Sequence, residues 1–386
     1  MFSPMNSRHF TERVNENGVR YWVLSTRVAP IQQGFYFVNS GFSEDGRYLW
    51  FYCAFLPAAG HCAGVVDFLT DEVRWFPETR GSGWMVDPLT GNLYWGCGQG
   101  IYMRTPHPQD RAVQIAELPE EAVRARVQEA GTHLTFTPDR KEILADLQTC
   151  FGSIVGTFSV KDGSFTEWYH TKPGTPYNHA QMCPTNGDLC MCAHEISYNP
   201  TTGKNDKPAL TEEGIYPRLQ LIGRDGSREM RKPYKNAATH EWWAADGKSI
   251  YYCSSESIVQ DRLGEHEAEV VCHIPIEGGN GTWHAHCTED EKYFVVDGSH
   301  PYAGKTWWRG CPSTVRFYNR ESGKLIDVVS YNPVVEGWTP EKPSIYHIDP
   351  HPRFVVGDRY VTFTTTVCGR VDVGIAETSQ LIELSR

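Results

Sequence analysis

The sequence contains no long hydrophobic run. None of its apolar stretches approaches the roughly 18 residues that a membrane-spanning helix requires, within a chain of 386 residues. Residues 1–14 are polar and lack the hydrophobic segment of a secretory signal. We therefore expect a cytoplasmic protein without a membrane partner.

Positive charge is also scarce. The chain carries 36 Lys and Arg against 47 Asp and Glu, which gives a formal net charge of −11. This balance argues against binding to nucleic acid or to an anionic membrane surface. A polyanionic substrate would have to be met by a local basic pocket.

The cysteines show no disulfide framework. The chain has 12 of them, scattered, and several fall inside strand-like runs, including Cys53, Cys97 and Cys253. Small apolar thiols buried in a reducing compartment fit this distribution better than the paired cysteines of a secreted domain. We expect free thiols, in agreement with a cytoplasmic location.

Helix signals are few, whereas one hairpin pattern recurs. In residues 239–253 an apolar run enters Asp246-Gly247 and leaves through an aromatic and β-branched run. This pattern predicts two strands joined by a tight two-residue turn. Seven copies predict an all-β, seven-bladed β-propeller that forms a single domain over residues 1–386. The copies span residues 36–52, 87–95, 133–147, 179–192, 240–253, 284–296 and 351–366.

The intervals between the copies supply outer strands, at residues 65–76, 154–169, 219–230 and 315–330. After the seventh copy only residues 371–376 and 380–384 remain for this purpose. We therefore expect an N-terminal strand near residues 19–25 to complete the last blade. This arrangement closes the ring and removes its exposed sheet edges.

Only residues 120–129 have a helical composition, with Pro119 placed to open the helix. Longer insertions are expected at residues 197–217, 258–266 and 301–311. Insertions on one face of a propeller usually build its pocket.

Five histidines occupy equivalent positions in the repeat. Three of them precede the turn aspartate by six residues, and the other two precede it by seven and nine. A single histidine of this kind is more often a hydrogen-bonded core residue. Five in seven copies favour a shared site around the mouth of the central channel. They are His133, His240 and His284, then His351 and His179.

One of these histidines belongs to the run Tyr346-His347-Ile348-Asp349-Pro350-His351-Pro352. The two prolines disfavour a helix, and residues two apart in an extended strand share a face. We therefore expect His347, Asp349 and His351 to project together. Two imidazoles and a carboxylate suit manganese, iron or zinc. His284, and His286 in the same alternation, are candidates for further ligands from the neighbouring blade. The alternative is a polar rim without metal.

Five local runs are similar to those of oligogalacturonate lyases, a family of cytoplasmic seven-bladed propellers that use manganese. Their order and spacing agree over roughly residues 30–370. The runs are Thr239-His240-Glu241-Trp242; the His179 segment that ends in Cys192-Ala193-His194-Glu195; Arg218 before Leu219-Gln220-Leu221-Ile222; His284 with Val296-Asp297-Gly298; and His351-Pro352-Arg353-Phe354.

The resemblance implies specific roles. His240 falls on the family's catalytic base and Arg218 on its catalytic arginine, and His284 and His351 fall on two manganese ligands. Asp349 stands where the family has a third ligand histidine, and the family's glutamine ligand falls near Tyr346. The metal site is therefore expected to be rebuilt, weakened or absent.

The implied reaction is a β-elimination on a small anionic oligosaccharide of 4-linked uronic acids, as in pectin degradation. The C5 proton is weakly acidic beside an ionised carboxylate, so a metal or a guanidinium must hold the developing charge. A histidine is suited to remove that proton near neutral pH. Candidates for binding the carboxylate or hydroxyl groups of the substrate are Arg80, His133, Tyr177, His179 and Arg353.

Two other functions stay open. A related propeller lyase or hydrolase could act on another uronate glycan, such as a rhamnosyl-glucuronate or ulvan fragment. A non-catalytic scaffold is the third hypothesis, although a scaffold has no need of five histidines at the channel mouth.

Overall fold

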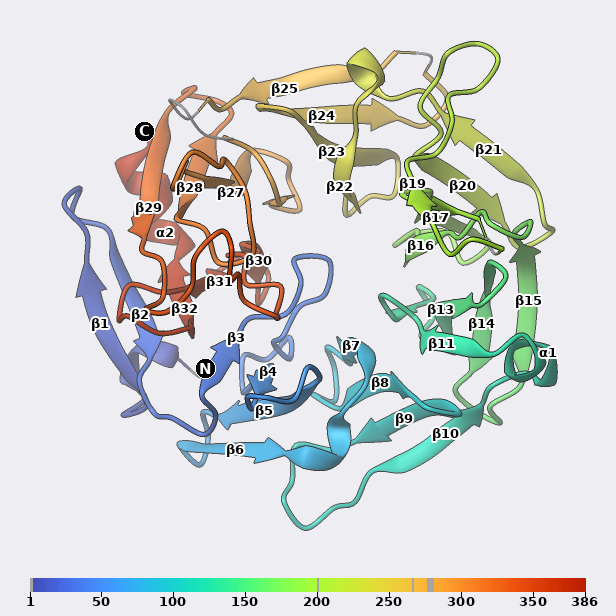
Figure 1. The fold of residues 1–386 in the computed structure, drawn as a ribbon. Helices are drawn as coiled ribbons and strands as arrows, with labels where there is room; N and C mark the ends of the chain where they lie inside the picture. Colours follow the sequence, from blue (N-terminus) through green and yellow to red (C-terminus); the bar gives the residue numbers. More distant parts are fainter. Residues whose placement is uncertain (1–2, 200, 266, 276–280) are drawn as a thin grey trace.

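The computed structural model describes residues 3–199, 201–265, 267–275 and 281–386. Seven antiparallel sheets of four or five strands stand around a central channel, as the blades of a propeller do (Figure 1). The predicted all-β, seven-bladed fold is confirmed.

Each blade begins with a strand beside the channel and ends with a strand at the rim. In blade 3 two short strands, β11 and β12, share the innermost position, because they pair with different halves of β13. The strands of the first three blades are β3 (Ile31–Gln33), β4 (Tyr48–Ala54), β5 (His61–Asp67) and β6 (Glu72–Phe76); β7 (Ser82–Val86), β8 (Leu93–Cys97), β9 (Gly100–Arg104) and β10 (Val113–Glu117); and β11 (Val127–Ala130), β12 (Thr135–Phe136), β13 (Glu142–Thr149), β14 (Ser153–Ser159) and β15 (Phe165–His170).

Blade 4 carries an additional hairpin, β18 with β19, inside the expected insertion at residues 197–217. The strands of blades 4 to 6 are β16 (Asn178–Met182), β17 (Leu189–Ala193), β18 (Ser197–Tyr198), β19 (Asn205–Asp206), β20 (Leu219–Gly223) and β21 (Arg228–Arg231); β22 (Thr239–Trp243), β23 (Ser249–Ser254), β24 (Ser257–Arg262) and β25 (Glu269–His273); and β26 (Ala285–Cys287), β27 (Tyr293–Ser299), β28 (Ser313–Asn319) and β29 (Leu325–Asn332).

The N-terminus closes the ring in blade 7. Strand β2 pairs with β32, with Trp22 opposite Ile375, which confirms the strand expected near residues 19–25. Strand β1 then extends the sheet; it was not predicted, because four of its five residues face solvent and show no apolar alternation. The strands of blade 7 are β30 (Arg353–Val355), β31 (Tyr360–Thr365), β32 (Asp372–Glu377), β2 (Arg20–Leu24) and β1 (Phe10–Val14).

Three other expectations are wrong. Residues 380–384 belong to helix α2 (Thr378–Leu384), since β2 already occupies the strand position beside β32. Helix α1 (Glu120–Arg124) is shorter than residues 120–129, because Arg126 has a φ of 56° and the chain then pairs as β11. Residues 258–262 are part of strand β24 and no insertion; His266 lies outside the described residues.

The turn at Asp246-Gly247 is wider than the expected two-residue turn. The hairpin is closed by a hydrogen bond of 2.9 Å from the Ala244 N–H to the Ser249 carbonyl. Only Gly247 has a positive φ, of 68°. The Asp246 carboxylate instead accepts the Lys248 N–H at 2.9 Å, so that the aspartate closes the turn with its side chain.

Aromatic side chains fill the space between blades. Trp242 stacks on Tyr251 with ring centroids 5.3 Å apart, and both rings are buried. Such pairs add to the stability that apolar burial provides. All 12 cysteines are free thiols, as expected. Within the described part of the chain, no helix is long and apolar enough to cross a membrane.

Residues 34–43, here called the channel segment, cross the central channel instead of forming the expected strand (Figure 1). Arg353 donates to the carbonyls of Phe37 and Val38, at 2.5 and 2.7 Å. Asn39 donates to the Trp84 carbonyl at 2.8 Å. The channel segment therefore separates two cavities, one at each end of the channel.

Candidate functional site

The histidines of the repeat meet at one end of the channel. Ring centroids of His240 and His284 lie 4.1 Å apart, those of His284 and His351 4.3 Å, and those of His133 and His179 5.0 Å. The five equivalent positions thus form one cluster, as the spacing of the repeat predicts.

Backbone irregularities direct these side chains into the channel. His179, His240 and His351 have positive φ values of 54°, 54° and 46°. The first two lie in β-bulges, where the strand register shifts between residues 178 and 181 and between residues 239 and 242. A bulge re-aims a side chain, and left-handed backbone at a non-glycine residue is a strained arrangement often found at functional sites.

Tyr36 of the channel segment lies in the middle of this cluster. Its ring stacks on His133, with centroids 4.9 Å apart, and contacts His351 edge-on at 4.7 Å. Rings of His179 and His284 lie 5.9 and 5.6 Å away. Burial raises the pKa of the Tyr36 phenol, so it stays protonated at neutral pH.

A cavity of about 450 Å³, here called the histidine cavity, opens above this cluster. Its volume falls within the range of small-molecule sites. It reaches from the histidines across to blades 1 and 2. Its lining includes Tyr36, Tyr52, His61, Trp84, Glu129, His133, His179, Glu195, His240, His347 and His351.

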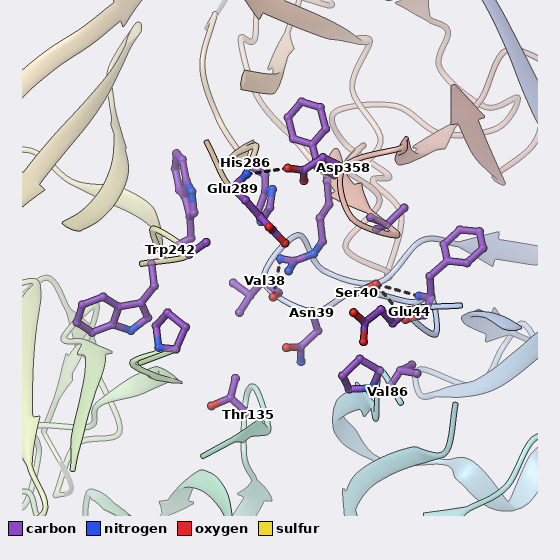
Figure 2. A pocket seen from close by; sticks show the side chains of 18 of the residues that line it. Val38, Asn39, Ser40, Glu44, Val86, Thr135, Trp242, His286, Glu289 and Asp358 are labelled. Atoms are coloured by element: carbon purple, nitrogen blue, oxygen red, sulfur yellow. Dashed lines mark hydrogen bonds between the residues drawn. The ribbon is translucent and has the colours of Figure 1, made fainter. Parts of the chain in front are cut away.

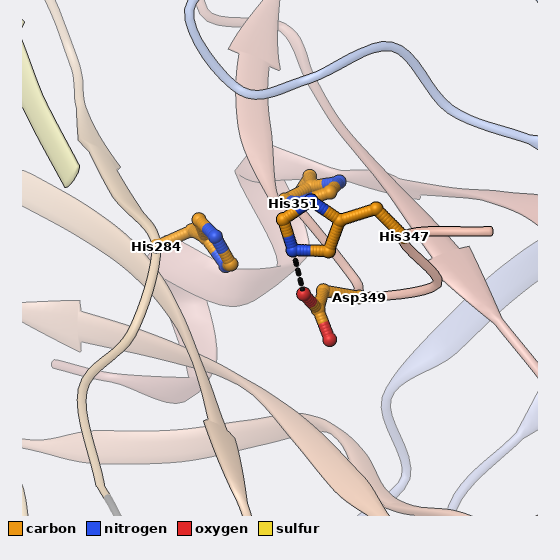
Figure 3. A group of neighbouring side chains, drawn as sticks. All are labelled: His284, His347, Asp349 and His351. Atoms are coloured by element: carbon orange, nitrogen blue, oxygen red, sulfur yellow. Dashed lines mark ion pairs between the residues drawn. The ribbon is translucent and has the colours of Figure 1, made fainter. Parts of the chain in front are cut away.

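His284, His347, Asp349 and His351 form a candidate metal centre (Figure 3). One ligand-type atom from each lies within 4.8 Å of the others. The structure brings these residues together although residues 343–352 form an irregular loop, not the extended strand on which we based the expectation. The suggested fifth ligand, His286, is wrong, because its ring lines the opposite cavity.

The donor set fits a divalent cation. Burial lowers the pKa of His284 to about 3 and that of His351 well below its usual value, so both imidazoles are neutral, the form that binds metal. Nε2 of His284 and both ring nitrogens of His351 are buried without a hydrogen-bond partner among the described residues. Asp349 adds a carboxylate, 2.6 Å from Nε2 of His347.

Asp297 fixes the orientation of His284. Its carboxylate lies 3.0 Å from Nδ1 of His284 and also accepts the backbone N–H groups of His284 and His351, at 2.7 and 3.0 Å. With Nδ1 held in this way, Nε2 is directed toward the other candidate ligands. Carboxylate–histidine pairs of this kind orient metal ligands in proteins.

His240, the candidate base, lies beside this centre. Burial lowers its pKa well below the usual value, and the neighbouring His284 and Arg218 act in the same direction. Its imidazole is therefore neutral at neutral pH and able to accept a proton. Its buried Nδ1 has no hydrogen-bond partner among the described residues.

Arg218 is held between two carboxylates. Its Nε donates to Glu241 at 2.9 Å and its NH1 group to Glu195 at 2.6 Å. Burial opposes ionisation of Glu195, but the charges of His179 and Arg218 outweigh it and lower the pKa of Glu195 to about 2. Arg218 is only 3% exposed and lies behind the cavity wall. Within the described structure its NH2 group has no hydrogen-bond partner.

His179 joins this network at the cavity surface. Its Nδ1 lies 3.4 Å from a carboxylate oxygen of Glu241. Burial lowers the pKa of His179, but the hydrogen bond to Glu241 and the charges of Glu195 and Glu241 outweigh burial, so the net shift is upward. His133 differs, since burial and the neighbouring His179 lower its pKa. The cavity wall thus holds one imidazole that favours the charged form and one that favours the neutral form.

Two of the predicted substrate-binding residues lie away from the cavity lining. Tyr177 is buried inside blade 4, where its hydroxyl accepts a hydrogen bond of 2.9 Å from Arg228. Arg80 is exposed and passes over Gly60, outside the lining residues. Their roles as substrate contacts stay predictions that the geometry does not favour.

Arg353 points to the other end of the channel, into a second cavity of about 580 Å³ (Figure 2). We call it the turn cavity, because the ends of the inner strands and their turns surround it. Figure 2 shows His286, Glu289 and Asp358 around it, with Val38 and Asn39 of the channel segment. Arg353 therefore anchors the channel segment and stands apart from the histidine cavity.

Sequence reasoning assigned no role to Tyr36, Glu195, Glu241 or Asp297. For three of these a signal existed, because Glu241, Glu195 and Asp297 are carboxylates placed among apolar strand residues. A carboxylate in such a position must find a buried partner. Tyr36 gave no such signal, since an aromatic residue is expected in any strand.

The fold and the cluster define a seven-bladed β-propeller with a histidine-lined channel. No family model and no curated protein sequence matches the chain. Among solved structures, an oligogalacturonate lyase in complex with manganese has a TM-score of 0.70 and 16% identity, over 95% of this chain and 96% of that chain. An oligogalacturonate lyase from Vibrio parahaemolyticus has a TM-score of 0.67 and 18% identity, over 95% and 96%.

The β-propeller domain of Cps50 (Swd1) from Myceliophteria thermophila is less similar, with a TM-score of 0.54 and 11% identity over 91% of this chain and 98% of that chain. The resemblance to oligogalacturonate lyases that the local runs indicated is thus confirmed in the fold. At these identities the likeness concerns architecture, and function must be argued from the site.

Proposed function

We propose that this protein is an oligosaccharide lyase that cleaves 4-linked uronic acid residues by metal-assisted β-elimination. One observation carries the proposal. A neutral, buried imidazole, His240, lies 4.1 Å between ring centroids from His284, which belongs to a four-residue group with the ligand types of a divalent metal. A base beside an electrophile is the combination that this elimination needs.

In the proposed reaction His240 removes the proton from C5 of the uronate. The electrons of the C5–H bond form the C4=C5 double bond, and the bond from C4 to the glycosidic oxygen breaks. The leaving oxygen takes a proton from solvent water, His240 gives up the proton it removed to solvent, and the product is a 4,5-unsaturated uronate. A neutral histidine suits the first step, since it need not lose a proton before it acts.

The negative charge that develops at the uronate carboxylate needs stabilisation. A divalent cation, manganese in our proposal, would supply it when held by His284, His351, Asp349 and His347. Among the described residues, NH2 is the nitrogen of the Arg218 guanidinium without a partner, because Glu241 and Glu195 hold Nε and NH1; in our proposal the fixed guanidinium stabilises this charge from behind the cavity wall. His133 and His179 line the cavity and are suited to bind substrate hydroxyl or carboxylate groups.

The fold resemblance supports the proposed substrate class. Solved oligogalacturonate lyases share the architecture over nearly the whole chain, which favours a short pectic oligosaccharide. Because Asp349 stands where oligogalacturonate lyases have a ligand histidine, related uronates should be tested as well. A cytoplasmic location is part of the proposal, and the 12 free thiols support it.

The decisive experiment is a screen of uronate oligosaccharides with the manganese-loaded protein, monitored by ultraviolet absorbance. Only elimination yields a C4=C5 double bond conjugated to the carboxylate. The panel includes galacturonate oligomers, rhamnosyl-glucuronate and ulvan fragments. Cleavage without absorbance would show a hydrolase, and no cleavage of any member would leave the scaffold hypothesis.

A further inference from the structure

One of the insertions carries aromatic and basic side chains that the proposed chemistry does not use. Residues 300–311 connect β27 to β28 in blade 6, at the end of the channel where His284 lies. The side chain of Trp307 is 49% exposed. An exposed aromatic group marks a binding surface when neighbouring side chains extend it into a patch rimmed by polar groups.

Trp307 connects to the candidate metal centre through one further indole, that of Trp283. Its ring meets that of Trp283, with centroids 5.3 Å apart and planes at 68°. Trp283 precedes His284 in the chain, and their rings lie 5.9 Å apart. The two indoles thus continue the site outward from His284 along blade 6.

The loop that presents Trp307 is firmly anchored. The next residue, Trp308, is only 5% exposed and packs against Tyr302. The Arg309 carbonyl accepts the Ser344 N–H at 3.2 Å, which ties the loop to the segment that leads to His347. Trp307 is therefore held outward by a neighbour that is buried, and a ligand would meet a pre-organised surface.

The charge of this loop is opposite to that of the whole protein. Residues 300–311 contain Lys305 and Arg309 and no Asp or Glu, in a chain of net charge −11. Both cations are exposed, and neither has an acidic ion-pair partner within the described structure. The Arg309 guanidinium donates to the Ile345 carbonyl at 3.4 Å. An exposed indole on a loop that also carries two exposed cations matches a uronate, which has an apolar sugar face and a carboxylate.

We propose that Trp307 and Trp283, with Lys305 and Arg309, form a subsite that binds a second uronate residue of the same oligosaccharide, next to the residue held in the histidine cavity. This inference rests on the proposed function and specifies its substrate as an oligomer. The indole of Trp307 stacks on the sugar, and the two cations attract its carboxylate.

The test compares ligands of increasing length. Calorimetry with the manganese-loaded full-length protein, in a His240→Ala background that prevents turnover, gives affinities for galacturonate monomer, dimer and trimer. Trp307→Ala should lower affinity for the longer ligands about tenfold, the scale of a lost stacking partner, with little change for the monomer. Trp75→Ala, which removes an indole 42% exposed on β6, is the matched control.

A second pair of ligands separates stacking from charge. Lys305→Gln should weaken binding of the free-acid trimer but not of its methyl ester, whereas Trp307→Ala should weaken both. If Trp307→Ala binds every length as the parent protein does, the subsite is overturned while the proposed function stands. If the parent protein itself neither binds nor cleaves any uronate, the proposed function fails and the subsite with it.

Discussion

The two ends of the channel are built by the same inner strands but differ in chemistry. Histidines only two positions apart in the chain lie at different ends of the channel. His284 joins the histidine cluster, whereas His286 lines the turn cavity. The turn cavity is the larger, at about 580 Å³ against about 450 Å³. Neither the volume of a cavity nor the presence of a histidine in its lining therefore identifies the functional site.

The two ends of the channel differ in how the two histidines of blade 6 are held. His284 has Asp297 on one nitrogen and candidate ligands near the other. His286 has an unpaired Nδ1 within the described structure and packs on the ring of Phe354, with centroids 6.2 Å apart. Catalysis requires oriented groups, and only one end of the channel supplies them.

The strongest test of this comparison removes one histidine from each end. His240→Ala should lower kcat by about 10²-fold or more, the scale of a lost general base, and leave a folded protein. His286→Ala should leave kcat close to that of the wild type, because its ring faces the turn cavity. Initial rates of ultraviolet-absorbing product, with circular dichroism as the fold control, measure both. Near-wild-type turnover of a folded His240→Ala protein would contradict our assignment.

The next test concerns the guanidinium behind the cavity wall. Arg218→Lys should lower kcat/KM by about 10²-fold, the effect of losing one donor at a developing charge. An ammonium group cannot hold Glu195 and Glu241 and still present a further donor in a fixed plane. The matched control is Arg231→Lys at the rim, where Arg231 pairs with Asp261 through two contacts of 3.1 and 2.6 Å. An equal loss of kcat/KM in both variants would show that the effect comes from lower protein stability and not from a role of Arg218 in the reaction.

Asp297→Asn addresses the metal centre without changing a ligand. An amide retains the size but cannot accept all three N–H groups that Asp297 now accepts, so His284 loses its fixed orientation. We expect manganese affinity to fall about 10- to 100-fold, as for other groups that orient ligands. Calorimetric titration with manganese measures the affinity, and Asp261→Asn is the control. Unchanged affinity in Asp297→Asn would refute this role.

The fold was largely predictable because it repeats. Seven hairpins of similar length identify a propeller, and errors at single turns, such as that at Asp246-Gly247, do not alter the count. The wrong predictions of secondary structure arose where the expected position of one element is occupied by another. Helix α2 replaces a strand because the N-terminus fills the outer position of blade 7, which depends on contacts between residues far apart in the sequence.

The site was predictable in its residue types and less so in its partners. Spacing brought His240, His284 and His351 together, since equivalent positions of a closed repeat must meet at its axis. Spacing could not show that Arg353 turns away, because the channel segment that accepts its hydrogen bonds was expected to be a strand. The positive φ of His240 was equally hidden, because a bulge depends on strand pairing and not on local preference.

The smallest expected effect concerns stability above neutral pH, and it isolates His179. The groups that face His179 are Glu241, Glu195, Arg218, His133 and Tyr36. Because the pKa of His179 is raised in the folded protein, its stabilising contribution is complete below the unfolded pKa of about 6.5. That contribution is lost as the pH rises through the folded pKa.

Most of the other histidines of the cluster do not interfere in this window. The pKa values of His133, His240, His284 and His351 are lowered in the folded protein, so these rings are neutral in both states once the pH is well above the unfolded value of about 6.5. The pKa of His347 is also raised, by Asp349 against the effect of burial, and His179 acts to lower it, so a minor part of any change on replacing His179 comes from His347. His179→Gln should therefore flatten the decline in unfolding free energy above about pH 6.5, measured by urea denaturation at a series of pH values. Parallel declines in the two proteins would show that Glu241 and Glu195 do not hold a proton on His179.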